Sequence, residues 1–295
     1  MEEIEKKVRR KKKIDAFFVI VLIVLIVYVI SLLIPLLWTF LTSFKTRGDY
    51  ILNKMGFPKK FEFKNYAVAV KNFYIDYDTG PVKIGGMILN SLIYAFGCSF
   101  ALTAGNCLVA YCCAKFSNFK ISSVYTTIVI VAMALPIIGS EPSSLQMLMA
   151  LGFYDKLLCI ILCQVRFLGL YYLVFLAAFK GIPKDYSEAA YIDGAGNFTI
   201  FFKLMIPFVS KTFLTVMLIH FITYWNDYQT PLLYMPTHPT LAYGLYKYSH
   251  SYKAAISSTP MKMAGCMILF LPILVVFCVF QRQLIGNVMM GGVKE

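Results

Sequence analysis

Three carboxylates lie close together in one polar segment of the chain. Asp185, Glu188 and Asp193 fall within residues 181–196, between two long apolar runs. Grouped carboxylates can act as general acids and bases in an enzyme. They can also stabilise and solvate a short helix, because negative charge is favourable near a helix N-terminus. The residues around them favour the second interpretation.

The spacing of these residues predicts a short helix. Pro183 suits a helix entrance, Asp185 can cap the first turn, and Glu188 stands three residues later, as in a capping box. Gly194 and Gly196 supply the stop, because glycine adopts the left-handed backbone that ends many helices. The predicted helix is therefore short and held at both ends.

One face of the predicted helix carries almost no side chain. Ala189 and Ala190 have strong helix propensity and would let another protein surface approach closely. An ordinary capped helix in a connecting loop would have the same features. The residues alone leave both interpretations open.

The composition excludes a soluble enzyme. Hydrophobic residues make up 59% of the chain and charged residues 15%, with a mean hydropathy of +0.69. Soluble domains have roughly 45–50% apolar and about 25% charged residues. Too little polar surface would remain to cover a core, and disorder requires low hydrophobicity. We therefore expect a membrane protein.

Six apolar runs are long enough to cross a bilayer, which takes about 20 residues of helix. Four contain no charge, and the other two carry one cation each. The predicted spans are residues 16–40, 84–114, 121–140, 157–179, 204–226 and 263–281. The sequence predicts an all-α polytopic membrane protein with six transmembrane helices, although four or five spans remain possible if Arg166 marks a loop.

The distribution of lysine and arginine predicts the orientation. The tail 1–15 carries seven, and together with 115–120, 180–203 and 282–295 that side holds 14 cations in 59 residues. The opposite side holds 12 in 95, eight of them in the loop 41–83. Both termini are expected in the cytoplasm. The net charge of +13 is then explained by topology, and no nucleic-acid partner is predicted.

Arg166 interrupts the predicted fourth span. An intramembrane cation is expected to face the bundle interior or a partner and to have a function. Alternatively, residues 141–166 form an outer re-entrant loop with a short helix, which would place Arg166 near the membrane surface. Both interpretations are retained.

Other polar and small residues inside the predicted spans indicate packing between helices. Gly97, Ala101 and Gly105 recur every four residues, so another helix could approach that face closely. His220 is expected to be a packing histidine. The eight cysteines form no C-x-x-C pair, and no metal site is predicted.

The polar segment resembles a known motif. Glu188-Ala189-Ala190, then Gly194, then Leu204-Met205-Ile206-Pro207 match the EAA motif of ABC importer permeases, E-A-A-x3-G-x9-I-x-L-P. The surroundings resemble the carbohydrate-uptake, maltose-transporter-like branch. The further matches are Ile192-Asp193-Gly194-Ala195, Trp225-Asn226-Asp227-Tyr228 and Gly291-Gly292-Val293-Lys294.

This resemblance implies the fold of a type-1 ABC importer transmembrane domain. The implied organisation is a basic cytoplasmic tail 1–15, an anchor helix 16–40, an extracytoplasmic loop 41–83, a permease core 84–281 with a coupling loop 180–203, and a cytoplasmic tail 282–295. The coupling contact would be made by Glu188, Ala189, Ala190, Asp193 and Gly194, with Pro207 starting the fifth span.

The resemblance also implies partners. In this family two cytoplasmic ATPase subunits close on ATP and rotate the permease helices through the EAA loop. The chain lacks G-x-x-x-x-G-K-[ST], so ATP and Mg²⁺ are expected on the ATPases, with no cofactor on this chain. A second homologous permease and an external solute-binding protein would complete the importer in a bacterial-type plasma membrane.

The substrate path is expected among the helices. Sugars require hydrogen-bonding groups and flat apolar surfaces, and the end of the fifth span offers both kinds. The candidates are Tyr224, Trp225, Asn226, Asp227 and Gln229, together with Arg166. The alternative is that Trp and Tyr form an interfacial belt while Asn226 and Asp227 terminate the helix.

Three other functions remain to be weighed. A permease for a non-sugar solute would share all these features. An integral-membrane enzyme would need a catalytic cluster, and the three carboxylates of the polar segment are the only candidates. A secondary transporter would be expected to have inverted repeats and acidic residues within its membrane spans, and neither is evident in the sequence.

Overall fold

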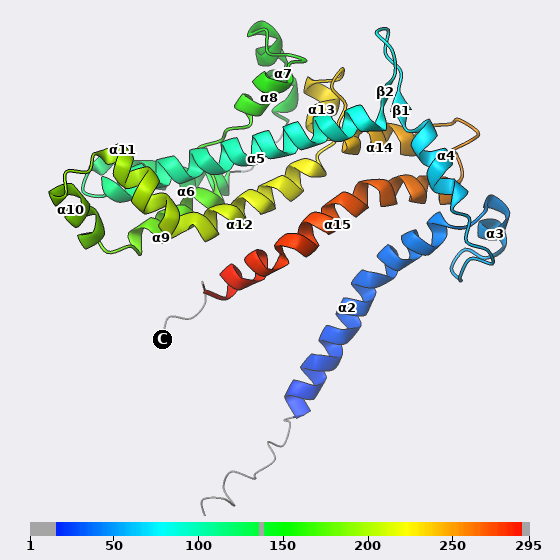
Figure 1. Ribbon diagram of the computed structural model, residues 1–295, viewed down its shortest axis with the longest axis horizontal. Helices are drawn as coiled ribbons and strands as arrows, with labels where there is room; N and C mark the ends of the chain where they lie inside the picture. Colours follow the sequence, from blue (N-terminus) through cyan, green and yellow to red (C-terminus); the bar gives the residue numbers. More distant parts are fainter. Residues whose placement is uncertain (1–15, 136–138, 291–295) are drawn as a thin grey trace, which may run out of the picture. The chain divides into compact units, whose positions relative to one another are not determined.

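The computed structural model describes residues 16–135 and 139–290, and those residues are mostly helical (Figure 1). The chain divides into two compact units. The first comprises residues up to Ala69 with Lys253–Met267, and the second comprises Val70–Tyr252 with residues from Ile268 onward. The predicted tail 1–15 and residues 291–295 of the predicted C-terminal tail lie outside the described residues.

The first unit begins with a long apolar helix. Helix α2 (Ala16–Ser43) covers the predicted anchor and has a mean hydropathy of 3.5 in its most apolar window. Helices α3 (Arg47–Leu52) and α4 (Lys64–Asn72) follow, so the predicted loop 41–83 has structure of its own. Lys45 is buried, and its ammonium group donates to the carbonyl of Asn53 at 2.8 Å.

The second unit contains a small hairpin and most of the remaining helices. Strands β1 (Tyr74–Ile75) and β2 (Val82–Lys83) pair antiparallel, with Tyr74 opposite Lys83. The helices are α5 (Ile84–Lys115), α6 (Lys120–Ala134), α7 (Glu141–Ala150), α8 (Leu157–Cys163), α9 (Leu170–Lys180), α10 (Asp185–Ile192), α11 (Asn197–Thr199), a π-helical turn (Ile200–Met205), α12 (Ile206–Trp225), α13 (Gln229–Tyr234) and α14 (Leu241–Ser249). Helix α15 (Thr259–Met290) begins in the first unit and continues into the second.

Helix α5 is the centre of the second unit. It packs along α12 and α9 (Figure 1), and the core between them contains Cys107, Ala110, Tyr172 and Phe175, all essentially without exposed surface. Aromatic contacts fix the direction of each neighbour. Tyr111 meets both Phe179 and Phe201, whereas Tyr94 meets Tyr224. Helix α9 therefore runs parallel to α5, and α12 runs antiparallel.

The predicted small-residue face of α5 is confirmed. A Cβ atom added to Gly97 would stand 2.8 Å from Ile161 of α8, and one added to Gly105 would stand 3.0 Å from Val165. The face therefore receives α8 and the segment that follows it. His220 is also a packing residue, because it is buried and its Nδ1 lies 2.9 Å from the Thr103 hydroxyl.

The prediction of one continuous helix over 157–179 is wrong. Helix α8 ends at Cys163, α9 begins at Leu170, and Arg166 lies in the break between them. Two causes are evident in the sequence: Gln164 and Arg166 are polar, and Gly169 has low helix propensity. The hydroxyl of Tyr125 donates to the Phe167 carbonyl at 2.7 Å and satisfies part of the interrupted backbone.

The predicted third span is also shorter than expected. Helix α6 ends at Ala134, although the apolar run extends to residue 140. Leu135 adopts extended backbone, as expected for a residue that precedes a proline, here Pro136. Among the described residues, four helices are long and apolar enough to cross a membrane: α2, α5, the continuous helical segment Asn197–Trp225, and α15 through Gln281.

The close approach at α5 generates a stability prediction. We expect Gly97→Leu and Gly105→Leu to destabilise the protein by about 1–3 kcal/mol, because the new side chains would overlap Ile161 or Val165. The thermal unfolding midpoint of the purified chain in detergent measures this. Gly85→Leu is the matched control, since a Cβ at Gly85 meets nothing within 4 Å and gains the same helix propensity. Equal midpoints for all three variants would contradict the packing argument.

Candidate functional site

The predicted polar helix is present as α10, but its start differs from the prediction. The residue before the helix is Lys184, which already has helical backbone and makes no side-chain capping bond. Asp185 therefore lies inside the first turn and cannot serve as the cap. The capping box of Asp185 and Glu188 was wrong, although both carboxylates still lie in the first turn, where the helix dipole favours negative charge.

The predicted stop at Gly194 is confirmed in detail. Gly194 has a φ of +81°, its N–H donates to the Tyr191 carbonyl at 3.0 Å, and the N–H of Ala195 donates to the Ala190 carbonyl at 2.9 Å. This pair of bonds is the Schellman motif, which ends a helix through one left-handed residue. The motif turns the chain sharply away from α10 toward α12.

The helical segment that follows starts earlier than predicted. Helical backbone runs without interruption from Asn197 through Trp225, and Pro207 lies in the first turn of α12. Proline has no N–H and crowds the carbonyl four residues before it. The turn before α12 is wider than an α-helical turn, since the N–H of Ile206 donates to the carbonyl of Phe201, five residues earlier.

Helix α10 presents three different stripes. Ala190 packs against the core of the second unit. Lys184, Glu188 and Tyr191 line a cavity, together with Ser187. Asp185, Ala189 and Ile192 lie outside that cavity and are exposed, Ile192 by 87%. The four motif residues Glu188, Ala189, Ala190 and Gly194 therefore do not share one surface.

A polar node joins the end of α5 to the polar segment. The side-chain carbonyl oxygen of Asn197 accepts hydrogen bonds from Lys115 and, at 2.6 Å, from the Tyr191 hydroxyl. The Lys115 ammonium also lies 5.3 Å from the centre of the Tyr191 ring and 5.7 Å from that of Tyr111. One signal for this node was available before the structure: Lys115 ends the uncharged run of α5.

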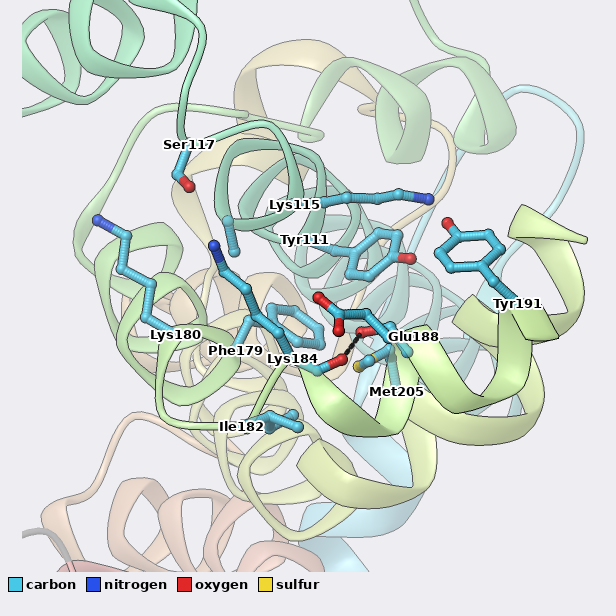
Figure 2. Close-up of a pocket in the computed structure, with 12 residues that line it drawn as sticks. Tyr111, Lys115, Ser117, Phe179, Lys180, Ile182, Lys184, Glu188, Tyr191 and Met205 are labelled. Atoms are coloured by element: carbon cyan, nitrogen blue, oxygen red, sulfur yellow. Dashed lines mark hydrogen bonds between the residues drawn. The ribbon is translucent and has the colours of Figure 1, made fainter.

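The cavity beside α10 has a volume of about 610 Å³. Its walls come from the end of α5, the end of α9 and the first two turns of α10 (Figure 2). Three lysines and one carboxylate line it, and Figure 2 shows the Glu188 carboxylate pointing into the cavity beside the Tyr111 ring. The charged residues are Lys115, Lys180, Lys184 and Glu188.

At the other end of α5, Asp227 has a structural role. One carboxylate oxygen accepts from the Tyr94 hydroxyl at 2.8 Å, and the other accepts from the backbone N–H groups of Gln229 and Thr230 at 3.0 and 3.1 Å. The Asp227 side chain therefore satisfies the first two N–H groups of α13 and ties this helix to α5. Asn226 ends α12, and its side-chain amide donates to the Ile222 carbonyl at 2.8 Å.

Tyr224 and Trp225 are packing residues in this structure. The Tyr224 ring meets Tyr94 edge to face at 5.7 Å between centres. Trp225 is only 3% exposed, stacks on Phe221, and donates from its indole N–H to the Leu269 carbonyl. Neither residue lines the polar cavity described next.

Three of the sequence candidates do come together. Arg166, Asp227 and Gln229 line a second cavity of about 240 Å³. Helix α7 contributes Glu141 and Ser144 to the same cavity, and neither was singled out from the sequence. The lining offers hydrogen-bond donors and acceptors, with both signs of charge.

These features are those of an integral membrane protein with two polar sites. A polar helical loop lies at one end of the packed helices α5 and α12, and a polar cavity lies toward their other end. The comparisons agree: residues 106–288 match the family described as "Binding-protein-dependent transport system inner membrane component". The chain belongs to this family of inner-membrane, multi-pass ABC importer permeases, in which the ATPase is a separate subunit.

Characterised relatives match nearly the whole chain. The diacetylchitobiose uptake permease NgcG of Streptomyces coelicolor is 27% identical over 265 residues, covering 89% of this chain and 84% of that protein. The melibiose/raffinose/stachyose import permease MelC of Bacillus subtilis is 24% identical, covering 88% and 91%.

A solved structure has the same fold. A chain from a bacterial ABC transporter that imports the acidic polysaccharide alginate superposes with a TM-score of 0.73 at 20% identity. The match covers 92% of this chain and 98% of the other. The fold of an ABC importer transmembrane domain is therefore confirmed.

The positive φ at the end of α10 generates a second prediction. We expect Gly194→Ala to weaken the Schellman turn by about 1–2 kcal/mol, because a Cβ atom disfavours left-handed backbone. Hydrogen exchange of the Ala195 amide should then be roughly tenfold faster. Gly196→Ala is the control, since Gly196 has a φ of −74° and open space around it. Equal exchange rates in both variants would be inconsistent with the assigned role.

Proposed function

We propose that this chain is the permease subunit of an importer for a sugar or oligosaccharide. The printed names of several relatives specify such substrates: diacetylchitobiose, starch degradation products, and melibiose, raffinose and stachyose. The structural observation that supports the permease role is α10, a short helix that ends in a Schellman turn and leaves Ala189 exposed beside the core; the sugar is supported by the names of the relatives. Another solute class would use the same fold and would be identified by uptake assays.

We assign six membrane crossings to the chain, with both termini in the cytoplasm. Helices α2, α5, Asn197–Trp225 and α15 each have the length of one crossing. Helix α6 is a shorter apolar helix, and the fourth crossing consists of α9 with the preceding break and α8. In this topology α10 lies on the cytoplasmic side and the cavity with Arg166 lies toward the outside.

The proposed coupling element is the loop 180–203. The exposed stripe of Asp185, Ala189 and Ile192 is available to a cytoplasmic ATPase, while Ala190 anchors the helix to the core. Because Asn197 bonds both Tyr191 and Lys115, displacement of α10 would be transmitted to the end of α5. Glu188, Asp193 and Gly194 complete the proposed coupling segment, and Pro207 lies at its junction with α12.

The proposed assembly contains four kinds of subunit. A second homologous permease pairs with this chain, and two ATPases bind ATP and Mg²⁺ in the cytoplasm. An external solute-binding protein docks on the outer loops 41–83, 141–156 and 227–262. The first of these loops contains α3, α4 and the hairpin, which gives it a defined surface.

The proposed substrate path includes the cavity of about 240 Å³. Arg166 and Gln229 supply hydrogen-bond donors, and Glu141 and Asp227 supply acceptors. Such paired donors and acceptors suit a polyhydroxylated molecule. Tyr224, Trp225 and Asn226 would act on this path indirectly, by fixing the end of α12.

The coupling assignment is tested by two substitutions in the polar segment. We expect Glu188→Lys and Gly194→Val to leave insertion and ATP hydrolysis intact but to lower sugar uptake by roughly fivefold or more, the usual range of coupling between sites. Uptake of labelled sugar and phosphate release are measured in vesicles containing the permeases, ATPases and binding protein. Gly196→Ala is the control. Normal uptake by both variants would disprove coupling through this loop.

The substrate path is tested separately. We expect Arg166→Gln to raise the KM for sugar uptake by roughly tenfold, because a hydrogen bond from a charged donor contributes about 1.5–3 kcal/mol. Lys120→Gln is the control, since Lys120 is an exposed cation outside both this cavity and the proposed docking loops. An unchanged KM in the Arg166 variant would remove this residue from the path.

A further inference from the structure

The cavity beside α10 carries two cations that the coupling proposal does not use. Lys180 ends α9 and Lys184 immediately precedes α10, and both side chains are exposed. Neither ammonium group has a hydrogen-bond or ion-pair partner within the described part of the chain. Lys115 differs, because its ammonium group is occupied by Asn197 and the neighbouring rings.

The charges in the cavity are arranged unevenly. In Figure 2 the ammonium groups of Lys180 and Lys184 lie on the Ser117 side, whereas Lys115 lies on the Tyr191 side. Three lysines and one carboxylate leave an excess of positive charge. The Ser117 hydroxyl lines the same cavity and adds a neutral donor. This set of donors suits a phosphate group.

The depth of the cavity points to a lipid. Lys115 and Lys180 are the last residues of two apolar helices, and lysines at helix ends lie at the membrane–water interface. Phe116 and Phe119 lie in the same connection as Ser117 and are 48% and 62% exposed, so this connection offers apolar surface to acyl chains. A phospholipid phosphate lies at the same level.

We propose that this cavity binds the phosphate headgroup of an anionic phospholipid from the inner leaflet. Lys180 and Lys184 contact the phosphate, Ser117 donates a hydrogen bond to it, and the acyl chains lie against Phe116 and Phe119. The leaflet assignment rests on the proposed topology, but the binding itself does not depend on transport.

The site is compatible with a docked ATPase. The exposed stripe of Asp185, Ala189 and Ile192 lies on a different side of α10 from Lys184, Glu188 and Tyr191, which line the cavity. A headgroup bound in the cavity would contact α10, α9 and the end of α5 together. The lipid would therefore favour one position of α10 relative to those two helices.

The proposal is tested by native mass spectrometry of the full chain released from micelles. The probes are phosphatidylglycerol and phosphatidylcholine with the same acyl chains. We expect selective retention of phosphatidylglycerol, reduced roughly fivefold by Lys180→Gln, by a similar factor by Lys184→Gln, and further by the double variant. Lys120→Gln is the matched control, because Lys120 is an exposed cation at the start of α6 outside the cavity.

Three results would overturn the proposal. The first is equal retention of phosphatidylglycerol by the wild type and the double variant, with all proteins eluting as the same folded species. The second is displacement of phosphatidylglycerol by millimolar inorganic phosphate, which would assign the cavity to a soluble anion. The third is loss of the lipid when the ATPase is added, which would assign the cavity to the ATPase. A failure of sugar uptake alone would test the proposed function and not this site.

Discussion

A backbone polar group inside a bilayer has no water to bind, so it must find its partner within the protein. Two irregular stretches of the second unit meet this constraint with side-chain hydroxyl groups. At the break between α8 and α9, the Phe167 carbonyl accepts from the Tyr125 hydroxyl. At the end of α5, the Cys113 carbonyl accepts from the Ser122 hydroxyl. Hydroxyl side chains thus allow the helices to stop and restart without leaving orphaned carbonyls at these points.

How much of the fold could be predicted depended on how clearly the charge and hydropathy of each segment indicated a membrane-spanning helix. Long uncharged runs predicted α2, α5 and α15 because hydrocarbon excludes charge regardless of tertiary packing. The region around Arg166 was harder, because apolar residues continue on both sides of the break. By helix propensity and hydropathy, Gln164, Arg166 and Gly169 are only weak interruptions of a helix. The partners that make the break tolerable, such as Tyr125, are distant in the sequence.

The polar segment shows the same contrast between local and distant information. Gly194 was predictable because a Schellman turn is specified within a few residues. The node of Lys115, Tyr191 and Asn197 was not, because it joins residues 82 positions apart. The position of Asp227 also required the structure. Its sequence neighbours indicated a helix end, but its bond to Tyr94 depends on the antiparallel packing of α5 and α12.

The bonds at the two ends of α5 limit how this helix can move. Near one end Tyr94 is bonded to Asp227, and at the other Lys115 is bonded to Asn197, so the flanks of the segment Asn197–Trp225 are held at both places. Sliding α5 past α12 by one helical turn, about 5.4 Å, would break both bonds together. Tilting the pair as a rigid lever would break neither. A tilt imposed at α10 would then reach the cavity with Arg166, at the far end of that lever, as a displacement in the opposite sense.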